Sequence, residues 1–278
     1  MLIQWFPGHM TKALREMQAV LPLVDIILYV LDARAVKSCF NPKFDELLKD
    51  KPKVYILNKA DLVPSGELKE WERYLTKSGN ACIAIEGTAS GSTKRIVPLV
   101  QELTKQKIEK YKAKGIKASI RGMVIGVPNS GKSTIINNFC VKKKATVGNK
   151  PGVTRGQQWV RVNELFELLD TPGTLYPKFE DKNIALNLAF IGSVKDDVVD
   201  KLELAAALIN TLKTLAPSAL KDRYALTDES TPEQILEKVA RQRGHIVKGG
   251  EVDIEKAAVS LLDDFRKGKL GKIMLDRL

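Results

Sequence analysis

Cysteine, histidine and long hydrophobic runs are all scarce in this sequence. Its three cysteines, Cys39, Cys82 and Cys140, are far apart and form no C-x-x-C pair, and only two histidines accompany them. This argues against a disulfide framework and against a structural zinc site. No apolar run approaches the roughly 18 residues that span a bilayer, and the first residues lack the basic start and long apolar middle of a signal peptide. We therefore expect a cytoplasmic protein that does not enter a membrane.

Positive charge, in contrast, is in excess. The formal net charge is +12. Residues 1–178 hold 29 Lys and Arg against 16 Asp and Glu, whereas residues 179–278 hold 16 against 17. An excess of this sign favours association with a polyanion such as nucleic acid, but a lysine-rich solubilising surface has the same composition. Charge alone leaves both interpretations open.

The most specific motif is Gly126-Val-Pro-Asn-Ser-Gly131-Lys132-Ser133, which matches the phosphate-binding loop G-x-x-x-x-G-K-[ST]. An apolar run leads in as a buried strand, and an amphipathic helix leads out. Glycines let backbone N–H groups close around phosphate oxygens at the positive end of that helix. Lys132 is expected to reach the β- and γ-phosphates, and the Ser133 hydroxyl to bind Mg²⁺. The predicted ligands in this loop are Asn129, Ser130, Gly131, Lys132, Ser133 and Thr134.

A second motif selects the base. Asn58-Lys59-Ala60-Asp61 follows an apolar strand predicted over residues 53–57 and matches the N-K-x-D element of GTPases. An ionised carboxylate only accepts hydrogen bonds, and guanine offers Asp61 two adjacent donors, its ring N–H and its exocyclic amine. Adenine presents an acceptor there, so the discrimination is large. We therefore predict GTP, rather than ATP, as the ligand of Asn58, Lys59 and Asp61.

A third motif, Asp170-Thr-Pro-Gly173, follows a strand predicted over residues 164–169. Asp170 fits the acidic residue that holds Mg²⁺, and the N–H of Gly173 fits the sensor of the γ-phosphate. Between this motif and the phosphate-binding loop lies Pro151-Gly-Val-Thr154. Thr154 suits the loop whose threonine completes the coordination of Mg²⁺.

The loop that braces guanine from behind is less well defined. It follows a strand predicted over residues 81–85. Strand-end spacing favours Glu86 and Gly87 as the contacts to the base, whereas the residue pattern favours Thr88 and Ala89. Both assignments stay open.

These motifs follow apolar strands, and in an open parallel α/β sheet ligands bind at the carboxyl ends of the strands. Their order is rotated, because the NKAD motif and the bracing loop precede the phosphate-binding loop. We therefore predict a circularly permuted P-loop GTPase domain over residues 1–178, with a mostly parallel sheet flanked by helices. A basic linker at about residues 104–120, helical and then broken at Gly115, joins the permuted halves.

Residues 179–278 are predicted to form a smaller all-α domain. Apolar spacing indicates helices over residues 181–192, 198–215, 218–224, 232–243 and 253–265. Basic residues in glycine-interrupted stretches suit a phosphate backbone or, equally, solvated helix ends. Because this domain directly follows the DTPG motif, we hypothesise that the nucleotide state moves it against residues 1–178.

The glutamine that orients the attacking water in Ras-like GTPases is missing, because Thr174 and Leu175 follow the DTPG motif. We expect intrinsic turnover on the order of 10⁻³ per second or less. The rotated order places His9 near the γ-phosphate, either as the water-orienting group or base or as a residue bound to backbone or solvent. Asn129 is placed either to coordinate K⁺ beside the phosphates or to form a hydrogen bond within its turn.

The start Trp5-Phe-Pro-Gly-His9-Met10, the motif order and the ending Asp264-Phe-Arg-Lys-Gly-Lys-Leu-Gly-Lys272 together resemble the ribosome biogenesis GTPase A (YlqF or RbgA) family, over essentially the whole chain. The resemblance implies a bacterial cytoplasmic GTPase, a monomer with Mg²⁺ and K⁺ as cofactors. It implies binding to late precursors of the large (50S) ribosomal subunit, through rRNA and ribosomal proteins. GTP turnover would be stimulated by the particle and by potassium and would accompany release. The resemblance also implies that His9 is catalytic, and Thr174 departs from the hydrophobic residue usual in the family.

Two alternatives from other functional classes stay open. One is a GTP-switched adaptor that binds a protein, whose interface would expose apolar anchors. The other is an RNA-binding scaffold with a barely hydrolytic nucleotide site, against which the intact Lys132, Ser133, Thr154 and Asp170 argue.

Overall fold

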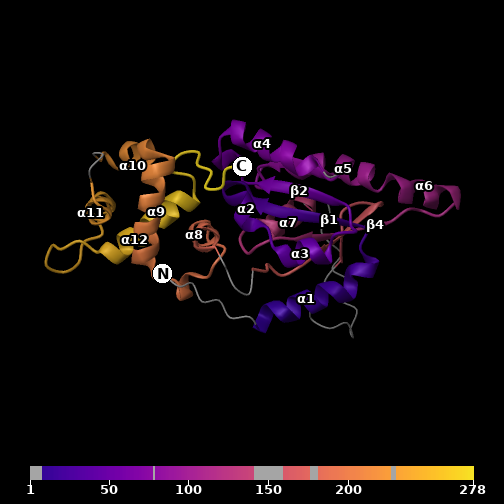
Figure 1. Cartoon of the computed structure of the whole chain (residues 1–278), viewed down its shortest axis with the longest axis horizontal. Helices are drawn as coiled ribbons and strands as arrows, with labels where there is room; N and C mark the ends of the chain where they lie inside the picture. The colour runs from indigo at the N-terminus through magenta and orange to yellow at the C-terminus, as the bar shows by residue number, and fades with distance from the viewer. Residues whose placement is uncertain (1–7, 78, 141–158, 176–180, 227–229) are drawn as a thin grey trace.

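The computed structural model describes residues 8–77, 79–140, 159–175, 181–226 and 230–278, apart from the side chains of residues 8–13. Within these residues one sheet contains β1 (Ile26–Asp32), β2 (Lys53–Asn58), β3 (Ala81–Ile85), β4 (Ile120–Ile125), β5 (Trp159–Arg161) and β6 (Phe166–Asp170). The helices that accompany it are α1 (Gly8–Val20), α2 (Val36–Cys39), α3 (Pro42–Leu47), α4 (Ser65–Thr76), α5 (Ile96–Leu103), α6 (Lys105–Ala113) and α7 (Lys132–Cys140). The helices after it are α8 (Lys182–Phe190), α9 (Lys201–Leu215), α10 (Pro217–Tyr224), α11 (Pro232–Arg243) and α12 (Ile254–Arg266). Figure 1 shows the sheet on one side of the molecule and α9 to α12 on the other.

The sheet has the strand order β3-β2-β1-β4-β6-β5, and all neighbouring strands are parallel except β5 and β6. Every residue of β1 is buried, because helices cover both faces of a parallel sheet and its strands are therefore apolar throughout. The pairing of β1 with β2 ends at Asp32 and Asn58. The polar residues that follow these two strands therefore start from neighbouring points on one edge of the sheet.

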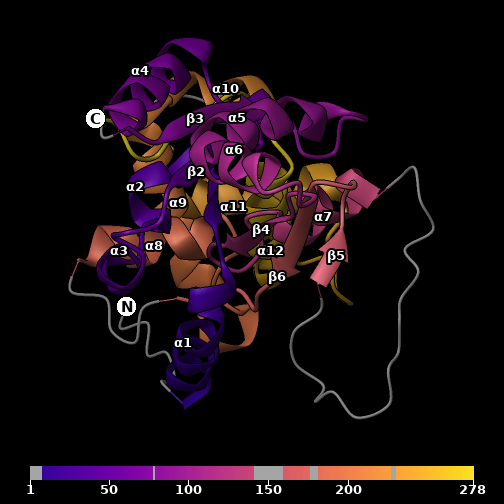
Figure 2. The same cartoon turned by 90° about the vertical axis from the view of Figure 1, so that its right-hand side faces the viewer.

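Successive residues of each strand face different apolar clusters, as the two-residue period of a strand requires. Ile26, Leu28 and Val30 of β1 share one cluster with buried residues of α5 and α7. Ile27, Tyr29 and Leu31 belong to the other cluster, which includes buried residues of α1, α2, α3 and α4. In Figure 2, α3 lies on the left of the sheet and α7 on its right.

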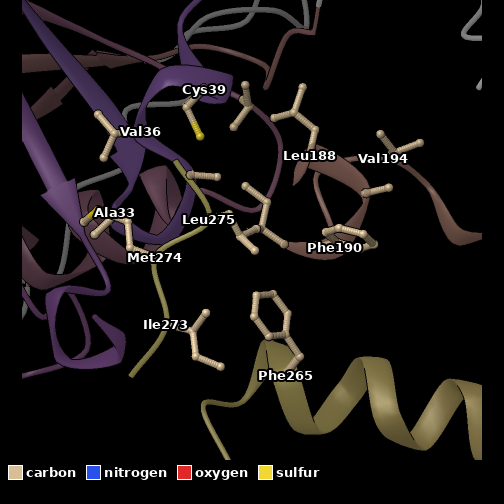
Figure 3. Close-up of a cluster of buried hydrophobic side chains, with 14 of the residues drawn as sticks. Ala33, Val36, Cys39, Leu188, Phe190, Val194, Phe265, Ile273, Met274 and Leu275 are labelled. Atoms are coloured by element: carbon tan, nitrogen blue, oxygen red, sulfur yellow. The ribbon is translucent and has the colours of Figure 1, made fainter. Parts of the chain in front are cut away.

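The second cluster continues from the sheet into the C-terminal helices. It contains the buried apolar residues of α8, α9, α11 and α12 as well as the chain that follows α12. Figure 3 shows Val36 and Cys39 on one side, Leu188 and Phe190 of α8 on the other, and Leu275 between these two pairs. Residues on either side of position 178 therefore share one apolar interior.

Polar caps fix where the C-terminal helices begin. Asp181, Asp200 and Asp253 each accept a hydrogen bond from a backbone N–H in the first turn of α8, α9 and α12. Thr231 and Gln234 form a reciprocal capping box at the start of α11. Such caps satisfy N–H groups that have no partner inside the helix. None of the helices in the described part of the chain has the length and apolar character that crossing a membrane requires.

The sequence predictions of regular structure agree with the observed elements to within a few residues. The four strands predicted to precede the motifs are present. The strand at residues 81–85 and the helix at 232–243 have their predicted bounds, and the other C-terminal helices shift by at most three residues at an end. In the predicted linker, α6 ends before Gly115, whose φ of 66° is left-handed. The antiparallel edge strand β5 was not predicted, because its three residues carry too little periodic signal.

Candidate nucleotide-binding site

A cavity of about 460 Å³ opens where the loops after β2, β3 and β4 meet. Its walls bring together residues that lie far apart in the sequence: Asn58, Lys59, Asp61, Leu62, Gly87, Thr88, Asn129, Gly131, Lys132, Ser133, Thr134 and Lys267. Ten of these positions were predicted as ligands of a guanine nucleotide from separate motifs, all but Leu62 and Lys267. The sheet therefore gathers the predicted phosphate and base contacts into one space.

Two glycines of the phosphate-binding loop occupy positions that no other residue fits. A Cβ at Gly126 would lie 2.3 Å from the carbonyl oxygen of Val30, and one at Gly131 would lie 2.0 Å from Nδ2 of Asn58. Both glycines also have positive φ values, 149° and 99°, which side chains disfavour. The loop consequently packs directly against the ends of β1 and β2.

Lys132 is buried with its ammonium group inside the phosphate-binding loop. Its Nζ donates hydrogen bonds to the carbonyl oxygens of Gly126, at 3.1 Å, and Val127, at 2.9 Å. Burial lowers the pKa of Lys132 to about 8, although the Asp170 carboxylate acts in the opposite direction. Two neutral carbonyls do not neutralise a cation, so an anionic ligand in this loop would stabilise the charged lysine.

Asn58 connects the phosphate-binding loop to the loop after β3. Its Nδ2 donates to the carbonyl oxygen of Ser130 at 2.8 Å, and its Oδ1 accepts the N–H of Gly87 at 2.9 Å. The side chain is buried, and both of its polar atoms are satisfied by backbone. Asn58 therefore acts as a brace between two parts of the cavity wall.

Lys59 crosses the outside of the phosphate-binding loop from a left-handed backbone position, with φ 60°. Its Nζ donates to the carbonyl oxygen of Asn129 and to Oδ2 of Asp32, each at 2.8 Å. Asp32 is fully buried and also receives Nε and Nη2 of Arg34. Burial alone would raise the pKa of Asp32, but Arg34 and Lys59 together lower it to about 2. The ionised Asp32 therefore fixes Lys59 in place.

The DTPG segment lies against the phosphate-binding loop. A Cβ at Gly173 would lie 2.8 Å from Cα of Pro128 and 3.0 Å from Nζ of Lys132, and the N–H of Thr174 donates to the carbonyl oxygen of Gly126 at 3.3 Å. Burial raises the pKa of Asp170, with Lys132 acting against it. Within the described residues, the buried hydroxyl of Thr174 has no hydrogen-bond partner.

The donor set at this end suits Mg²⁺. The Asp170 carboxylate ends β6, and the Ser133 hydroxyl lies in the first turn of α7. Mg²⁺ is commonly held by one or two protein oxygens together with phosphate oxygens and water, so these two residues are enough on the protein side. Thr154, the third predicted ligand, lies outside the described residues.

Hydrogen bonds within the protein already engage several polar groups of the bracing loop. Gly87 and Thr88 line the cavity, but the N–H of Gly87 already donates to Asn58 and the N–H of Ala89 to the carbonyl oxygen of Glu86. The Thr88 hydroxyl donates to the carboxylate of Glu86. Thr88 therefore differs from Gly87 and Ala89: it lines the cavity, and neither of these two backbone hydrogen bonds uses its own N–H.

The position of His9 is described only through its backbone, in the first turn of α1. α1 runs back along the sheet, so that its beginning lies toward the end where β1 and β2 have their carboxyl ends (Figure 1). The side chain of His9, like the preceding Trp5-Phe-Pro-Gly stretch and the segment 176–180 after DTPG, lies outside the described parts of the chain.

Asn129 has a contact that its motif did not suggest. Its Nδ2 donates to the carbonyl oxygen of Gly192 at 2.6 Å, and next to it Ser193 Oγ donates to the carbonyl oxygen of Pro128 at 2.7 Å. The turn after α8 therefore contacts the phosphate-binding loop directly. Neither the predicted K⁺ role nor a hydrogen bond within the turn accounts for this contact.

Sequence reasoning also missed three residues beside the cavity. Asp32 ends β1, Arg34 follows it, and together they position Lys59. Lys267 reaches the cavity from just beyond α12. Asp32 could have been found as a carboxylate that directly ends an apolar run. Lys267 gave no such signal, because it is one of several lysines in its stretch.

Comparison with known proteins gives consistent matches. A family model described as "50S ribosome-binding GTPase" matches residues 121–239. Ribosome biogenesis GTPase A of Bacillus licheniformis is 41% identical over 281 residues, which cover 100% of this chain and 99% of that protein. Mitochondrial ribosome-associated GTPase 1 of Bos taurus is 37% identical over 295 residues, which cover 99% of this chain and 88% of that protein.

Two solved structures are also similar. GNP-bound YlqF from T. maritima has a TM-score of 0.67 and 26% sequence identity, with 96% of this chain and 98% of that chain covered. The GDP-bound structure of TM YlqF has the same score and identity, with 95% and 99% covered. These matches confirm the predicted circularly permuted GTPase fold with a helical C-terminal part.

Proposed function

This chain belongs to the ribosome biogenesis GTPase A family, and on that premise we propose that it hydrolyses GTP in the cavity described above while acting in ribosome assembly. The observation that carries the site is the double hydrogen bond of Asn58 to Ser130 and Gly87. It joins the loop that fits phosphates to the loop beside the base, with Asp61 in the same wall. The relatives' names, which include ribosome biogenesis and ribosome association, support the process.

We assign the two ends of the cavity to the two ends of the nucleotide. Lys132, Ser133, Thr134 and the loop amides of residues 129–131 hold the phosphates, with Gly173 beside the terminal one. Asp61 accepts from the guanine ring N–H and amine, and Lys59 covers the base while its Nζ is held by Asp32 and Asn129. Thr88 is the residue of the bracing loop that we assign to the base. Mg²⁺ on Ser133, Asp170 and Thr154 would supply charge neutralisation for the phosphates.

The Asp61 assignment is tested by base selectivity. Asp61→Asn replaces one acceptor by a donor, which suits the second carbonyl of xanthine rather than the amine of guanine. We expect the variant to lose GTP affinity by roughly 100-fold or more and to prefer XTP, since a site that hydrogen-bonds a polar group strongly rejects an analogue lacking it. Dissociation constants for GTP, XTP and ATP are measured in both proteins. Equal uptake of ATP and GTP by the unaltered protein would remove the guanine assignment.

We further propose that the partner is a late precursor of the large ribosomal subunit and that hydrolysis accompanies release. The cationic excess of residues 1–178 supports contact with rRNA, because phosphate contacts are electrostatic and salt-dependent. In this proposal residues 1–178 form the GTPase domain, residues 179–278 contact RNA, and the protein is a cytoplasmic monomer. Co-sedimentation with precursor and mature large subunits, with a GTP analogue or GDP and across a salt series, tests it. Binding independent of nucleotide or of salt would favour a protein adaptor or a passive scaffold instead.

For the chemistry we propose that His9 orients or deprotonates the attacking water. Neither Thr174 nor Leu175, the two described residues directly after DTPG, can replace a glutamine, since both are buried. His9→Ala should lower particle-stimulated turnover by roughly 10²- to 10⁴-fold, the usual contribution of general acid–base catalysis, with GDP affinity unchanged. Unchanged turnover in this variant would remove His9 from the mechanism.

We also propose that the amide oxygen of Asn129 contributes to a K⁺ site beside the phosphates. The Nδ2–Gly192 hydrogen bond supports this, because it fixes the side-chain amide in one orientation. GTP turnover is compared in potassium and sodium buffers for the unaltered protein and Asn129→Ala. Equal turnover of the unaltered protein in the two buffers would contradict the proposal.

A further inference from the structure

One wall of the cavity comes from the C-terminal region. Lys267, the first residue after α12, lines the cavity together with Asp61 and Leu62. More than 200 residues separate it from Asp61 and Leu62, yet the chain reaches the cavity at a defined place. The contacts that hold this turn decide whether Lys267 is an incidental neighbour or a built part of the site.

The turn is packed directly onto the NKAD segment. A Cβ at Gly268 would lie 2.5 Å from Cδ2 of Leu62, so the backbone of Gly268 packs against the Leu62 side chain more closely than any other residue would allow. The N–H of Ile273 donates to the carbonyl oxygen of Leu62 at 3.0 Å, and the N–H of Leu275 donates to the carbonyl oxygen of Arg34 at 2.7 Å. Backbone hydrogen bonds therefore fix the chain after Lys267 to both β1 and β2 at their ends.

Arg34 also binds the end of α12, directly before this turn. Its Nη1 donates to the carbonyl oxygens of Phe265, at 3.3 Å, and Arg266, at 3.1 Å. These groups belong to the end of α12, where carbonyl oxygens have no partner within the helix and the helix dipole favours a cation. Because Arg34 and Lys59 share Asp32, one buried carboxylate connects the position of Lys59 with that of Lys267.

The ammonium group of Lys267 is already paired, so its methylene groups are the part of the side chain that can contact a ligand in the cavity. Its Nζ donates to Oδ2 of Asp263 at 2.9 Å, and the side chain is 60% exposed. A lysine commonly covers apolar surface with its methylene groups while its ammonium stays paired or hydrated. A purine ring beside Asp61 presents such an apolar surface.

We propose that Lys267 forms the outer wall of the base end of the guanine-nucleotide site, so that a bound nucleotide and the end of α12 stabilise each other. This inference rests on the proposed assignment of Asp61 to the base end. Covering the base does not involve the γ-phosphate, so GDP and GTP gain equally from Lys267. By linkage, either nucleotide also strengthens the docking of residues 267–275 by the factor that Lys267 contributes to its affinity.

Three variants distinguish the contribution of the Lys267 methylene groups to nucleotide affinity from that of its ammonium group. Lys267→Ala should weaken both GDP and GTP by about 4- to 15-fold, as expected when one or two methylene groups no longer cover the ring. Lys267→Met keeps an unbranched apolar stem and should stay within about twofold of the unaltered protein. Lys269→Ala is the matched control, because Lys269 lies two residues on, pairs with Asp264 and does not line the cavity.

Hydrogen exchange supplies a readout apart from affinity. Saturating GDP should slow exchange of the Ile273 and Leu275 amides in the unaltered protein and in Lys269→Ala, and less in Lys267→Ala. Urea unfolding of each variant confirms that the fold is intact. Affinities of Lys267→Ala within twofold of the unaltered protein, or an equal loss in Lys267→Met, would overturn the proposal.

The proposed base site is tested separately by Asp61→Asn. If Asp61→Asn loses GTP and Lys267→Ala does not, only the role of Lys267 is wrong. If Asp61→Asn retains GTP with full selectivity, the base site itself has been misplaced.

Discussion

The buried pair of Asp32 and Arg34 provides the most demanding test of how the cavity is built. Asp32 is fully buried and Arg34 is 2% exposed. The guanidinium donates Nε to Oδ1 at 2.9 Å and Nη2 to Oδ2 at 2.8 Å, a bidentate geometry that strengthens a charged hydrogen bond. Arg34→Met keeps the volume of the stem but leaves the carboxylate with Lys59 as its remaining cation among these contacts.

The expected cost follows from that loss. Removing one partner of a buried ion pair destabilises a protein by about 3–5 kcal/mol, because the other charge stays buried without compensation. Lys59 is partly exposed and bonds Asp32 through one nitrogen, so it compensates only in part. The carbonyl oxygens of Phe265 and Arg266 also lose the Arg34 donor, although that of Phe265 still accepts the N–H of Gly268. We therefore expect Arg34→Met to lower the free energy of unfolding by about 4 kcal/mol.

A double-mutant cycle distinguishes this reasoning from a simple loss of packing. Asp32→Asn combined with Arg34→Met removes both charges, so the double variant should be more stable than the sum of the single losses predicts, by about 2 kcal/mol or more. Free energies are measured by urea unfolding. The exposed pair Lys105–Glu109 serves as the control cycle, with an expected coupling below about 0.5 kcal/mol. A loss below about 1 kcal/mol for Arg34→Met, or additive losses in the Asp32–Arg34 cycle, would refute the argument.

Three further changes test other contacts. Thr174→Val replaces a buried hydroxyl that lacks a partner in the described structure, so urea unfolding should show a gain of about 1 kcal/mol; a loss would contradict it. The lowered pKa of Asp32, about 2 against an ordinary 3.8, contributes about 2 kcal/mol above pH 4 that is lost as the pH falls toward 2, and stability curves of Asp32→Asn should lack this drop. Gly131→Ala forces a Cβ onto Asn58 and should weaken GDP by about 10- to 100-fold, whereas Gly66→Ala, with open space around it, should not.

The sequence was sufficient for those parts of the site that are encoded locally. An apolar run followed by a polar motif identifies a strand and what stands at its end, and parallel packing then brings the ends together. Asn58, Asp61 and Lys132 could be placed in one cavity by this rule alone, before their contacts were known. Glycine was equally informative at Gly131, because the motif requires a backbone position that only glycine tolerates.

Contacts between distant segments carried no comparable signal. Arg34 contacts Phe265 and Arg266 across more than 200 residues, and nothing in the residues around Arg34 indicates this partner. Asn129 illustrates the same limit, since its pattern suggested a cation ligand or a turn residue and gave no sign that its Nδ2 donates to Gly192. Such pairs depend on how the helices of the C-terminal region pack against the rest of the chain. Hydrophobic periodicity describes each helix by itself and therefore does not predict these contacts.

The hypothesis that the whole C-terminal region swings with the nucleotide state meets an energetic objection. Its residues Phe265, Ile273 and Met274 are buried in the apolar cluster that continues to the sheet, and each contributes about 1.5–3 kcal/mol when fully buried. Separating even these three would cost on the order of 5 kcal/mol, whereas coupling between sites amounts to about 1–3 kcal/mol.

A smaller movement is compatible with that limit. At the phosphate end the region contacts the loop mainly through two hydrogen bonds, from Asn129 to Gly192 and from Ser193 to Pro128. Each contributes about 0.5–1.5 kcal/mol net, so a change among the phosphates is able to break them. The turn after α8 can therefore respond to the γ-phosphate while residues 267–275 stay docked at the base. On the proposed assignment of the nucleotide, the two hydrogen bonds from the turn after α8 lie at its phosphate end, and the docked residues 267–275 lie at its base end.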